Sequence, residues 1–137
     1  RPINTTDELV NAIKLSIPRQ NPKYTKSSIR RIFQSIRIEV NNELNEIVTS
    51  LDNIKNFIKT GGIMIFLTYH SIEDKIIKKF IDNEVKGCLC NPKYAICTCT
   101  NIAQFKLGEY KKRKPSTSEI QSNPRSKSAV LRYMVKI

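Results

Sequence analysis

Four polar residues, His70, Ser71, Glu73 and Asp74, follow directly after the apolar run of residues 63–68. In open α/β sheets, ligands bind beside the carboxyl ends of strands, where loops and helix N-termini converge. Imidazole and carboxylate groups at such a place can orient a substrate or move a proton, and His70 is the only histidine in the chain. The alternative is local: Ser71 and Asp74 only cap a helix, and His70 only hydrogen-bonds a carbonyl.

A second polar cluster, with Asn123, Arg125, Ser126 and Lys127, directly precedes the expected final strand. Arginine and lysine side chains pair with phosphate, and serine hydroxyls donate hydrogen bonds to it. The cluster therefore predicts a phosphate contact. An ordinary solvated turn is the alternative interpretation.

The four cysteines form two C-x-C pairs, Cys88 with Cys90 and Cys97 with Cys99. Four close thiols, in a chain that shows no secretion signal, favour a tetrahedral zinc site over disulfides. A metal would also hold together a loop, residues 87–100, that has little apolar core of its own. Reduced cysteines without metal are the equal alternative.

Basic residues exceed acidic ones, 24 against 12, which gives a net charge of +12 over 137 residues. The excess is largest in residues 106–137, which hold nine basic and two acidic side chains. Nucleic acid is the first candidate partner, because each neutralised phosphate releases counterions. A solvated basic tail is the alternative. No apolar run is long enough to span a bilayer.

Periodicity and capping signals predict two helices in the first part of the chain. The first runs from a capping-box pattern at Thr5 to Pro18. A polar connection, residues 18–26, leads to one long second helix, whose apolar residues recur every three or four positions as far as Leu51. The glycine pair at 61–62 ends this helical region.

The following segments predict an α/β unit. Residues 63–68 form a nearly continuous apolar run, which is typical of a strand in a parallel sheet covered by helices on both faces. A helix follows from Ser71, the patterns of residues 102–107 and 130–137 predict two more strands, and a short helix is expected near 118–122. Helix, buried strand, polar loop and helix in this order form half of a doubly wound α/β fold.

Three stretches of the chain resemble the RsmH family, also called MraW. They are RIFQSIRIEVNNEL at residues 31–44, GG at 61–62 followed by YHSIEDK at 69–75, and NPRSKSAVLR at 123–132. The matches occur in the family's order and span nearly the whole chain, and the paired C-x-C loop is similar to one found in many members. Lys75 and Lys127 stand where the family usually has arginine.

The resemblance implies an enzyme that methylates N4 of a cytosine in small-subunit ribosomal RNA, with S-adenosylmethionine as methyl donor. On this basis His70, Glu73 and Asp74 are expected to line the substrate side of the active site. The expected substrate-binding and RNA-binding residues are Arg31, Arg37, Asn41, Ser71, Asn123, Arg125, Ser126 and Lys127.

The family's glycine-rich cofactor loop has no counterpart in this sequence, whose four glycines are at 61, 62, 87 and 108. The resemblance therefore implies the C-terminal portion of a longer enzyme, inactive by itself, whose missing half binds most of the S-adenosylmethionine. Residues 1–26 would end a helical substrate-recognition insertion, and residues 27–137 would form the second half of a Rossmann-like class I methyltransferase sheet. The alternative is a non-catalytic, zinc-stabilised RNA-binding module.

The expected partner is small-subunit ribosomal RNA or the assembled small ribosomal subunit, with no membrane partner. No charged-then-apolar leader opens the sequence, so the expected compartment is the cytoplasm. An organelle with its own ribosomes is the alternative, because a transit peptide would lie in the missing portion.

Overall fold

The computed structural model describes residues 2–17, 22–88, 90, 96, 99, 101–110 and 112–137. It divides into two compact units, Arg1–Glu43 and Leu44–Ile137, and each is considered by itself. The sequence predicted a different boundary, after residue 26, which divides the chain by function. That boundary stays a prediction. No helix in the described part of the chain is long and apolar enough to cross a membrane.

The first helix of the first unit, α1 (Thr6–Ser16), begins as the sequence predicts. The Thr5 hydroxyl accepts a hydrogen bond from the Glu8 N–H at 3.2 Å, and the Glu8 carboxylate accepts one from the Thr5 N–H at 3.2 Å. This reciprocal capping box satisfies two backbone donors that no helical carbonyl can reach. α1 then packs against the second helix, and Ile13 is buried.

The long second helix is divided in two, so the prediction of one helix as far as Leu51 is wrong. α2 spans Pro22–Val40 and begins inside the predicted connection, with proline in the first turn, where its missing N–H costs nothing. α3 spans Glu43–Ile54. Between them Asn42 has a φ of 52°, a left-handed conformation that asparagine tolerates but that a helix interior excludes.

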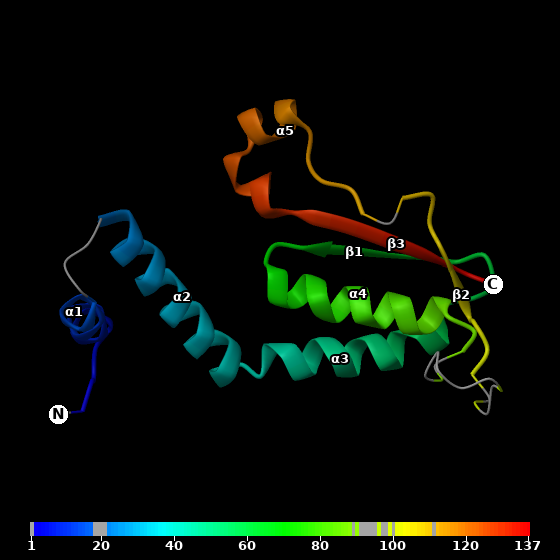
Figure 1. The fold of residues 1–137 in the computed structure, drawn as a ribbon, viewed down its shortest axis with the longest axis horizontal. Coiled ribbons are helices and arrows are strands. Elements are labelled where there is room, and N and C mark those ends of the chain that lie inside the picture. Colours follow the sequence, from blue (N-terminus) through cyan, green and yellow to red (C-terminus); the bar gives the residue numbers. More distant parts are fainter. Residues whose placement is uncertain are drawn as a thin grey trace. The chain divides into compact units, whose positions relative to one another are not determined.

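The second unit is built on a three-stranded sheet in the order β1-β3-β2 (Figure 1). Strand β3 (Val130–Lys136) pairs antiparallel with both β1 (Ile63–Thr68) and β2 (Phe105–Leu107). β1 and β2 therefore run parallel to each other, and α4 (Ser71–Val85) lies between them in the chain. The α/β class is confirmed, but the parallel neighbour expected for β1 is absent among the described strands.

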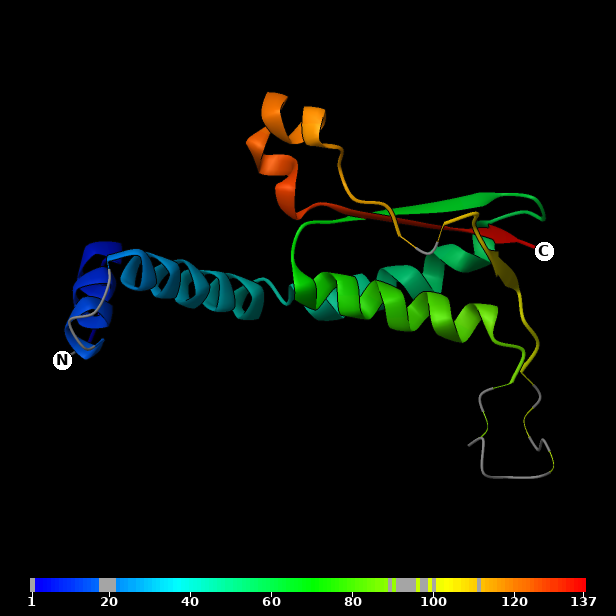
Figure 2. The same ribbon diagram turned by 45° about the horizontal axis from the view of Figure 1, so that its top comes forward.

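The direction of β3 follows from the path of the chain after β2. Residues 108–128 continue past the far end of the sheet, and Arg113 forms an isolated bridge with Leu131 on the way. The chain then reverses and enters β3 between the two earlier strands. Figure 2 shows this return path, with α5 (Thr117–Ser122) and the 3-10 turn η2 (Pro124–Ser128) beyond the strand end. The predicted short helix is thus confirmed as α5.

β1 is buried on one face only, contrary to the expectation of two buried faces. Met64 and Thr68 are buried, whereas Ile63, Ile65 and Leu67 are exposed on the opposite face. The alternation is the ordinary two-residue period of a strand. The second unit therefore presents an apolar sheet face on the side away from its core.

The core lies between the sheet and two helices, with α4 against the sheet and α3 beside α4 (Figure 1). Its buried members are Leu51, Met64, Ile77, Phe80, Ile81, Phe105 and Met134. The helical region ends earlier than the glycine pair: a 3-10 turn, η1 (Lys55–Phe57), follows α3, and Gly61, with a φ of 82°, turns the chain into β1.

Candidate functional site

The antiparallel pairing of β1 with β3 brings the two polar clusters of the sequence to one end of the sheet. Thr68, the last residue of β1, pairs with Val130, the first residue of β3. α4 begins just after β1 at Ser71, and η2 ends just before β3 at Ser128. Figure 1 shows both segments at the same end of the sheet.

His70 caps α4 and lies against Glu73. Its Nδ1 accepts a hydrogen bond from the Glu73 N–H at 3.4 Å, and the Glu73 carboxylate accepts one from the Tyr69 N–H at 3.1 Å. His70 Nε2 lies 2.8 Å from Glu73 Oε1, but the angle is too poor for a hydrogen bond, and among the described atoms Nε2 has no other partner. His70, and not Ser71, is therefore the capping residue, and Ser71 is exposed on the first turn.

Asp74 is bound to the central strand of the sheet. Its carboxylate accepts two hydrogen bonds from Arg132, from Nε at 2.8 Å and from Nη2 at 2.9 Å, and one from the Thr68 hydroxyl at 3.4 Å. The Arg132 hydrogen bond is the main reason that the pKa of Asp74 is lowered, against the opposing effect of burial. The same contact raises the pKa of Arg132. Asp74 therefore holds α4 to β3 as a charged group.

The turn before β3 exposes two basic side chains and buries Ser126. Asn123 caps η2, with its side-chain oxygen accepting from the Arg125 N–H at 3.3 Å. Ser126 is buried and its hydroxyl donates to the Asn123 carbonyl at 2.8 Å. Arg125 and Lys127 are exposed. The turn thus holds two cations at the surface, while Ser126 serves the turn itself.

An open cleft of about 430 Å³ lies beside this end of the sheet, on the face opposite Asp74. Leu67 and Leu131, which pair across β1 and β3, form part of its apolar wall. Arg113, Lys114 and Glu119 contribute its charged side chains. Its volume and mixed lining are those of ordinary small-ligand sites.

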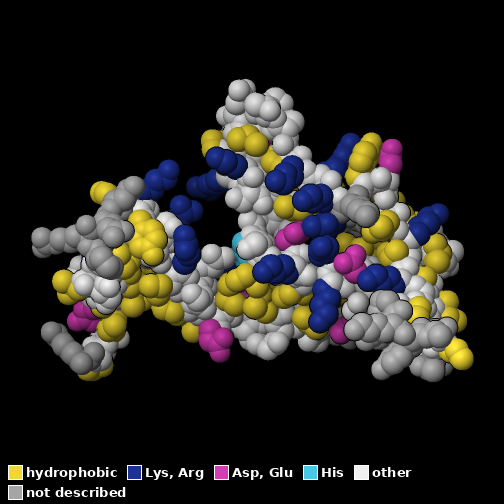
Figure 3. Space-filling model, in the orientation of Figure 1, with side chains coloured by type: hydrophobic (Ala, Val, Ile, Leu, Met, Phe, Trp, Pro, Cys, Tyr) yellow, Lys and Arg dark blue, Asp and Glu magenta, His cyan; other side chains and the backbone are white. Residues whose placement is uncertain are grey.

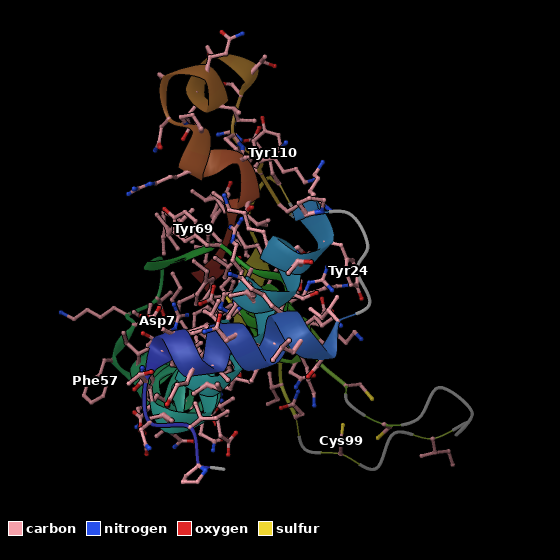
Figure 4. The ribbon with its side chains drawn as sticks, turned by 90° about the vertical axis from the view of Figure 1, so that its left-hand side faces the viewer. Asp7, Tyr24, Phe57, Tyr69, Cys99 and Tyr110 are labelled. Atoms are coloured by element: carbon pink, nitrogen blue, oxygen red, sulfur yellow. The ribbon has the colours of Figure 1, made fainter. Side chains whose placement is uncertain are left out.

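Exposed aromatic and basic side chains accompany the cleft. Tyr69 and Tyr110, labelled in Figure 4, are both exposed, and the Arg113 guanidinium lies 4.4 Å from the centre of the Tyr110 ring. Figure 3 shows Lys and Arg side chains distributed over the second unit with few acidic ones among them. Aromatic faces and cations together suit unstacked bases and phosphates.

The three predicted RNA-binding residues of the first unit differ in their partners. Arg37 forms a bidentate pair with Glu43, at 2.8 Å and 3.1 Å, and Asn41 donates to the same carboxylate at 3.3 Å. Arg31 donates to the neutral Ser27 hydroxyl at 3.0 Å and keeps an unneutralised charge in this contact. These residues belong to the first unit, and their RNA-binding role stays a prediction.

Three of the four cysteines lie close together. The sulfur atoms of Cys88, Cys90 and Cys99 are all within 4.8 Å of one another. Cys97 lies outside the described residues. The three thiols that the structure describes are thus clustered, and the metal site predicted from the sequence stays a prediction.

Thr68, Arg132 and the cleft residue Arg113 had no role predicted from the sequence. Arg132 lies in the NPRSKSAVLR stretch, but its partner Asp74 is 58 positions away in sequence. Arg113 was only one of the nine basic residues of 106–137. Its position beside Leu131 depends on the pairing of residues outside any local pattern.

The described residues do not form a glycine-rich cofactor cradle. The connection between β1 and α4 is Tyr69 and His70 and has no glycine. A β-carbon on Gly62 would meet the Lys59 carbonyl oxygen at 2.8 Å, so that glycine is required by its own turn.

Comparison with known proteins gives a consistent result over the whole chain. The model of the MraW methylase family matches residues 1–137. Proteins named ribosomal RNA small subunit methyltransferase H are 39% identical over 137 residues in Clostridioides difficile, 38% over 138 in Finegoldia magna and 34% over 137 in Halothermothrix orenii. Each match covers 100% of this chain and 44% of the relative, so the chain spans less than half of these proteins' length. The chain, with its α/β unit and its polar sheet end, belongs to the MraW methylase family.

Proposed function

We propose that this chain takes part in the S-adenosylmethionine-dependent methylation of small-subunit ribosomal RNA, and that the acceptor is the N4 amino group of a cytosine. Membership of a methylase family supports the reaction class. The relatives' name, ribosomal RNA small subunit methyltransferase, supports the substrate class. The N4 acceptor follows from the motif resemblance. The family match over all 137 residues favours this function over a non-catalytic RNA-binding module.

One observation carries the division of labour that we assign to the chain. The pairing of Thr68 with Val130 places the His70–Glu73 cap and the exposed Arg125 and Lys127 at one end of the sheet. A phosphate held by the basic turn would have its nucleotide beside the cap. The chain therefore provides the RNA side of the reaction. We assign the binding of S-adenosylmethionine chiefly to the part of the full-length relatives that this chain does not cover.

The chemistry of the acceptor explains why these groups are useful. The exocyclic amine of cytosine is a weak nucleophile because its lone pair is delocalised into the ring, so alignment with the methyl donor matters most. The base must also leave its stack to be reached. The Glu73 carboxylate can accept a hydrogen bond from the amino group as positive charge develops on it. His70, whose Nδ1 caps α4 and whose buried Nε2 lies against Glu73, positions that carboxylate. Asp74, already engaged by Arg132, acts as a positioning residue that fixes the first turn of α4.

The open face of the sheet supports the proposed place of the chain in the fold. Ile63, Ile65 and Leu67 leave an apolar surface opposite the core, as in sheets that are covered by helices on both faces. Residues 27–137 are accordingly proposed as the second half of a methyltransferase sheet, and residues 1–26 as the end of a helical insertion. The proposed substrate places the protein in the cytoplasm, where small ribosomal subunits are assembled.

Binding to small-subunit ribosomal RNA tests the RNA-side assignment. The double variant Arg125→Ala/Lys127→Ala should bind more weakly, and the slope of log affinity against log salt should fall by about 1 for each lost phosphate contact. Lys59→Ala is the matched control, because Lys59 is exposed near Gly61, at the opposite end of the sheet. If the double variant and Lys59→Ala lost equal RNA affinity, the binding would be non-specific electrostatic attraction, and the proposed RNA contact at Arg125 and Lys127 would be refuted.

The chemical step is tested in a chimera in which this chain replaces the matching 44% of the Clostridioides difficile relative. We expect N4-methylcytidine in the digested ribosomal RNA by mass spectrometry, and a large loss of kcat for Glu73→Gln with RNA affinity retained. Methylation at another cytosine atom would refute the N4 assignment. Tight binding of labelled S-adenosylmethionine by the 137-residue chain alone would refute the division of labour.

A further inference from the structure

The cysteine-rich segment begins and ends at the same place in the fold. α4 ends at Val85, and the side-chain amide of Asn101 donates to the Lys86 carbonyl at 3.0 Å. Nearby, the Gln104 N–H donates to the Glu84 carbonyl at 3.1 Å. These two hydrogen bonds hold the outgoing and returning arms of the loop together. The first C-x-C pair and Cys99 are therefore brought close by the backbone and not by chance contact.

The sulfur atoms at this place have the spacing of ligands around a single ion. Cys99 Sγ lies 3.7 Å from Cys88 Sγ, and Cys90 Sγ is within 4.8 Å of both. A Zn–S bond of about 2.3 Å with tetrahedral angles gives a sulfur–sulfur distance of about 3.8 Å. A disulfide would require about 2.0 Å. The observed separations therefore match shared coordination far better than a covalent bond between the pairs.

The backbone orients one of the sulfur atoms. The Cys90 N–H donates to Cys88 Sγ at 3.4 Å. Hydrogen bonds to ligand groups orient those groups in known metal sites. The described residues of the loop between Gly87 and Asn101 include no buried apolar side chain, and Ile96 is 77% exposed. The described residues of the loop thus contribute no hydrophobic core that would hold it together.

We propose that Cys88, Cys90 and Cys99 bind one Zn²⁺ ion, which closes the cysteine-rich loop at the C-terminal end of α4. Zn²⁺ is a borderline-soft ion that thiolates bind well, and three sulfur atoms at this spacing can occupy three of its four tetrahedral positions. Cys97 lies outside the described residues, and the proposal rests on the other three thiols. The site is separate from the proposed RNA-binding end of the sheet, so its test does not depend on the methylation proposal. Figure 4 shows Cys99 on the loop.

The test uses the full 137-residue chain, reduced and stripped of metal under anaerobic conditions. Addition of Co²⁺ should produce the sulfur-to-cobalt charge-transfer absorption and the intense visible bands of tetrahedral ligation, and Zn²⁺ should abolish both. Elemental analysis of protein grown with zinc should give about one ion per chain. Cys88→Ala and Cys99→Ala should each weaken zinc binding by at least about 100-fold.

Ile96→Ala is the matched control, because it shortens an exposed side chain of the same loop without removing a thiol. It should bind Co²⁺ and Zn²⁺ like the unmodified chain. Far-ultraviolet circular dichroism should show that the cysteine variants keep their helices and sheet, since none of the three cysteines belongs to the core. Absence of the charge-transfer band, unchanged affinity in the cysteine variants, or equal loss in Ile96→Ala would overturn the proposal.

Discussion

Replacing Asp74 with asparagine tests the contact that fixes α4 to the middle of the sheet. The Arg132 side chain is only 10% exposed and the Asp74 side chain 24% exposed, and two short hydrogen bonds join them. Asparagine keeps the shape of the carboxyl group but removes its charge. The guanidinium then stays largely buried and loses the carboxylate to which it is hydrogen-bonded.

The expected cost is about 2–3 kcal/mol of unfolding free energy. Removing one partner of a fully buried ion pair costs about 3–5 kcal/mol, and the solvent that reaches Asp74 reduces this figure. Arg132→Met should cost less, about 1–2 kcal/mol, because the remaining carboxylate is the more exposed partner and methionine replaces the buried stem. The order of the two costs follows from the difference in exposure.

Urea unfolding followed by circular dichroism at several pH values gives the measurement. Folding lowers the pKa of Asp74 from its ordinary value of 3.8, so the native state prefers the charged form. Its stabilising contribution is complete well above that value and is lost as the pH falls through the lower folded pKa. The difference between the unmodified chain and Asp74→Asn should therefore be constant above about pH 5 and shrink below about pH 4.

Asp52→Asn is the matched control, since its side chain is 62% exposed and its nearest cation is 3.8 Å away. It should change stability by less than about 0.5 kcal/mol. The reasoning is refuted if Asp74→Asn costs no more than this control. A large cost that does not diminish in acid would also refute it, because the charge would then not be its source.

Substitutions at Gly108, Asn42 and Thr5, two of them with a control substitution, test local features of the fold by thermal unfolding. Gly108→Ala should cost about 1–3 kcal/mol, because the new β-carbon would overlap the Tyr133 ring, whereas Gly87→Ala meets only a backbone nitrogen at 3.8 Å and should cost less than about 1 kcal/mol. Asn42→Ala should destabilise by about 1–2 kcal/mol at a φ of 52°, and Asn42→Gly should not; similar values for the two would contradict the left-handed turn. Thr5→Ala should cost about 1 kcal/mol through loss of the α1 cap, and no change would mean that the capping box is not formed in solution.

The local signals in the sequence predicted those elements whose cause is also local. The capping box at Thr5, the strand at residues 63–68 and the final strand all appear as expected. Capping depends on atoms within one turn, and strand patterns depend on alternation over a few residues. The division of the long helix at Asn42 was missed because its apolar periodicity continues across the break.

The candidate site was predicted in its components but not in its arrangement. The polar clusters at residues 70–74 and 123–127 were recognised separately, and the pairing of Thr68 with Val130 joins them. The partner of Asp74, by contrast, could not be read from its neighbours, because Arg132 reaches it only through the antiparallel register of β3.

The sequence by itself determined the family, the α/β class, the thiol cluster and the types of residue available for chemistry. These follow from composition, motif and short-range spacing. The tertiary structure alone decided that the last strand runs between the other two, that β1 keeps an open apolar face, and that Asp74 is bound to Arg132. Strand direction and register depend on which distant segments bury the most surface together, and that balance is a property of the whole sheet.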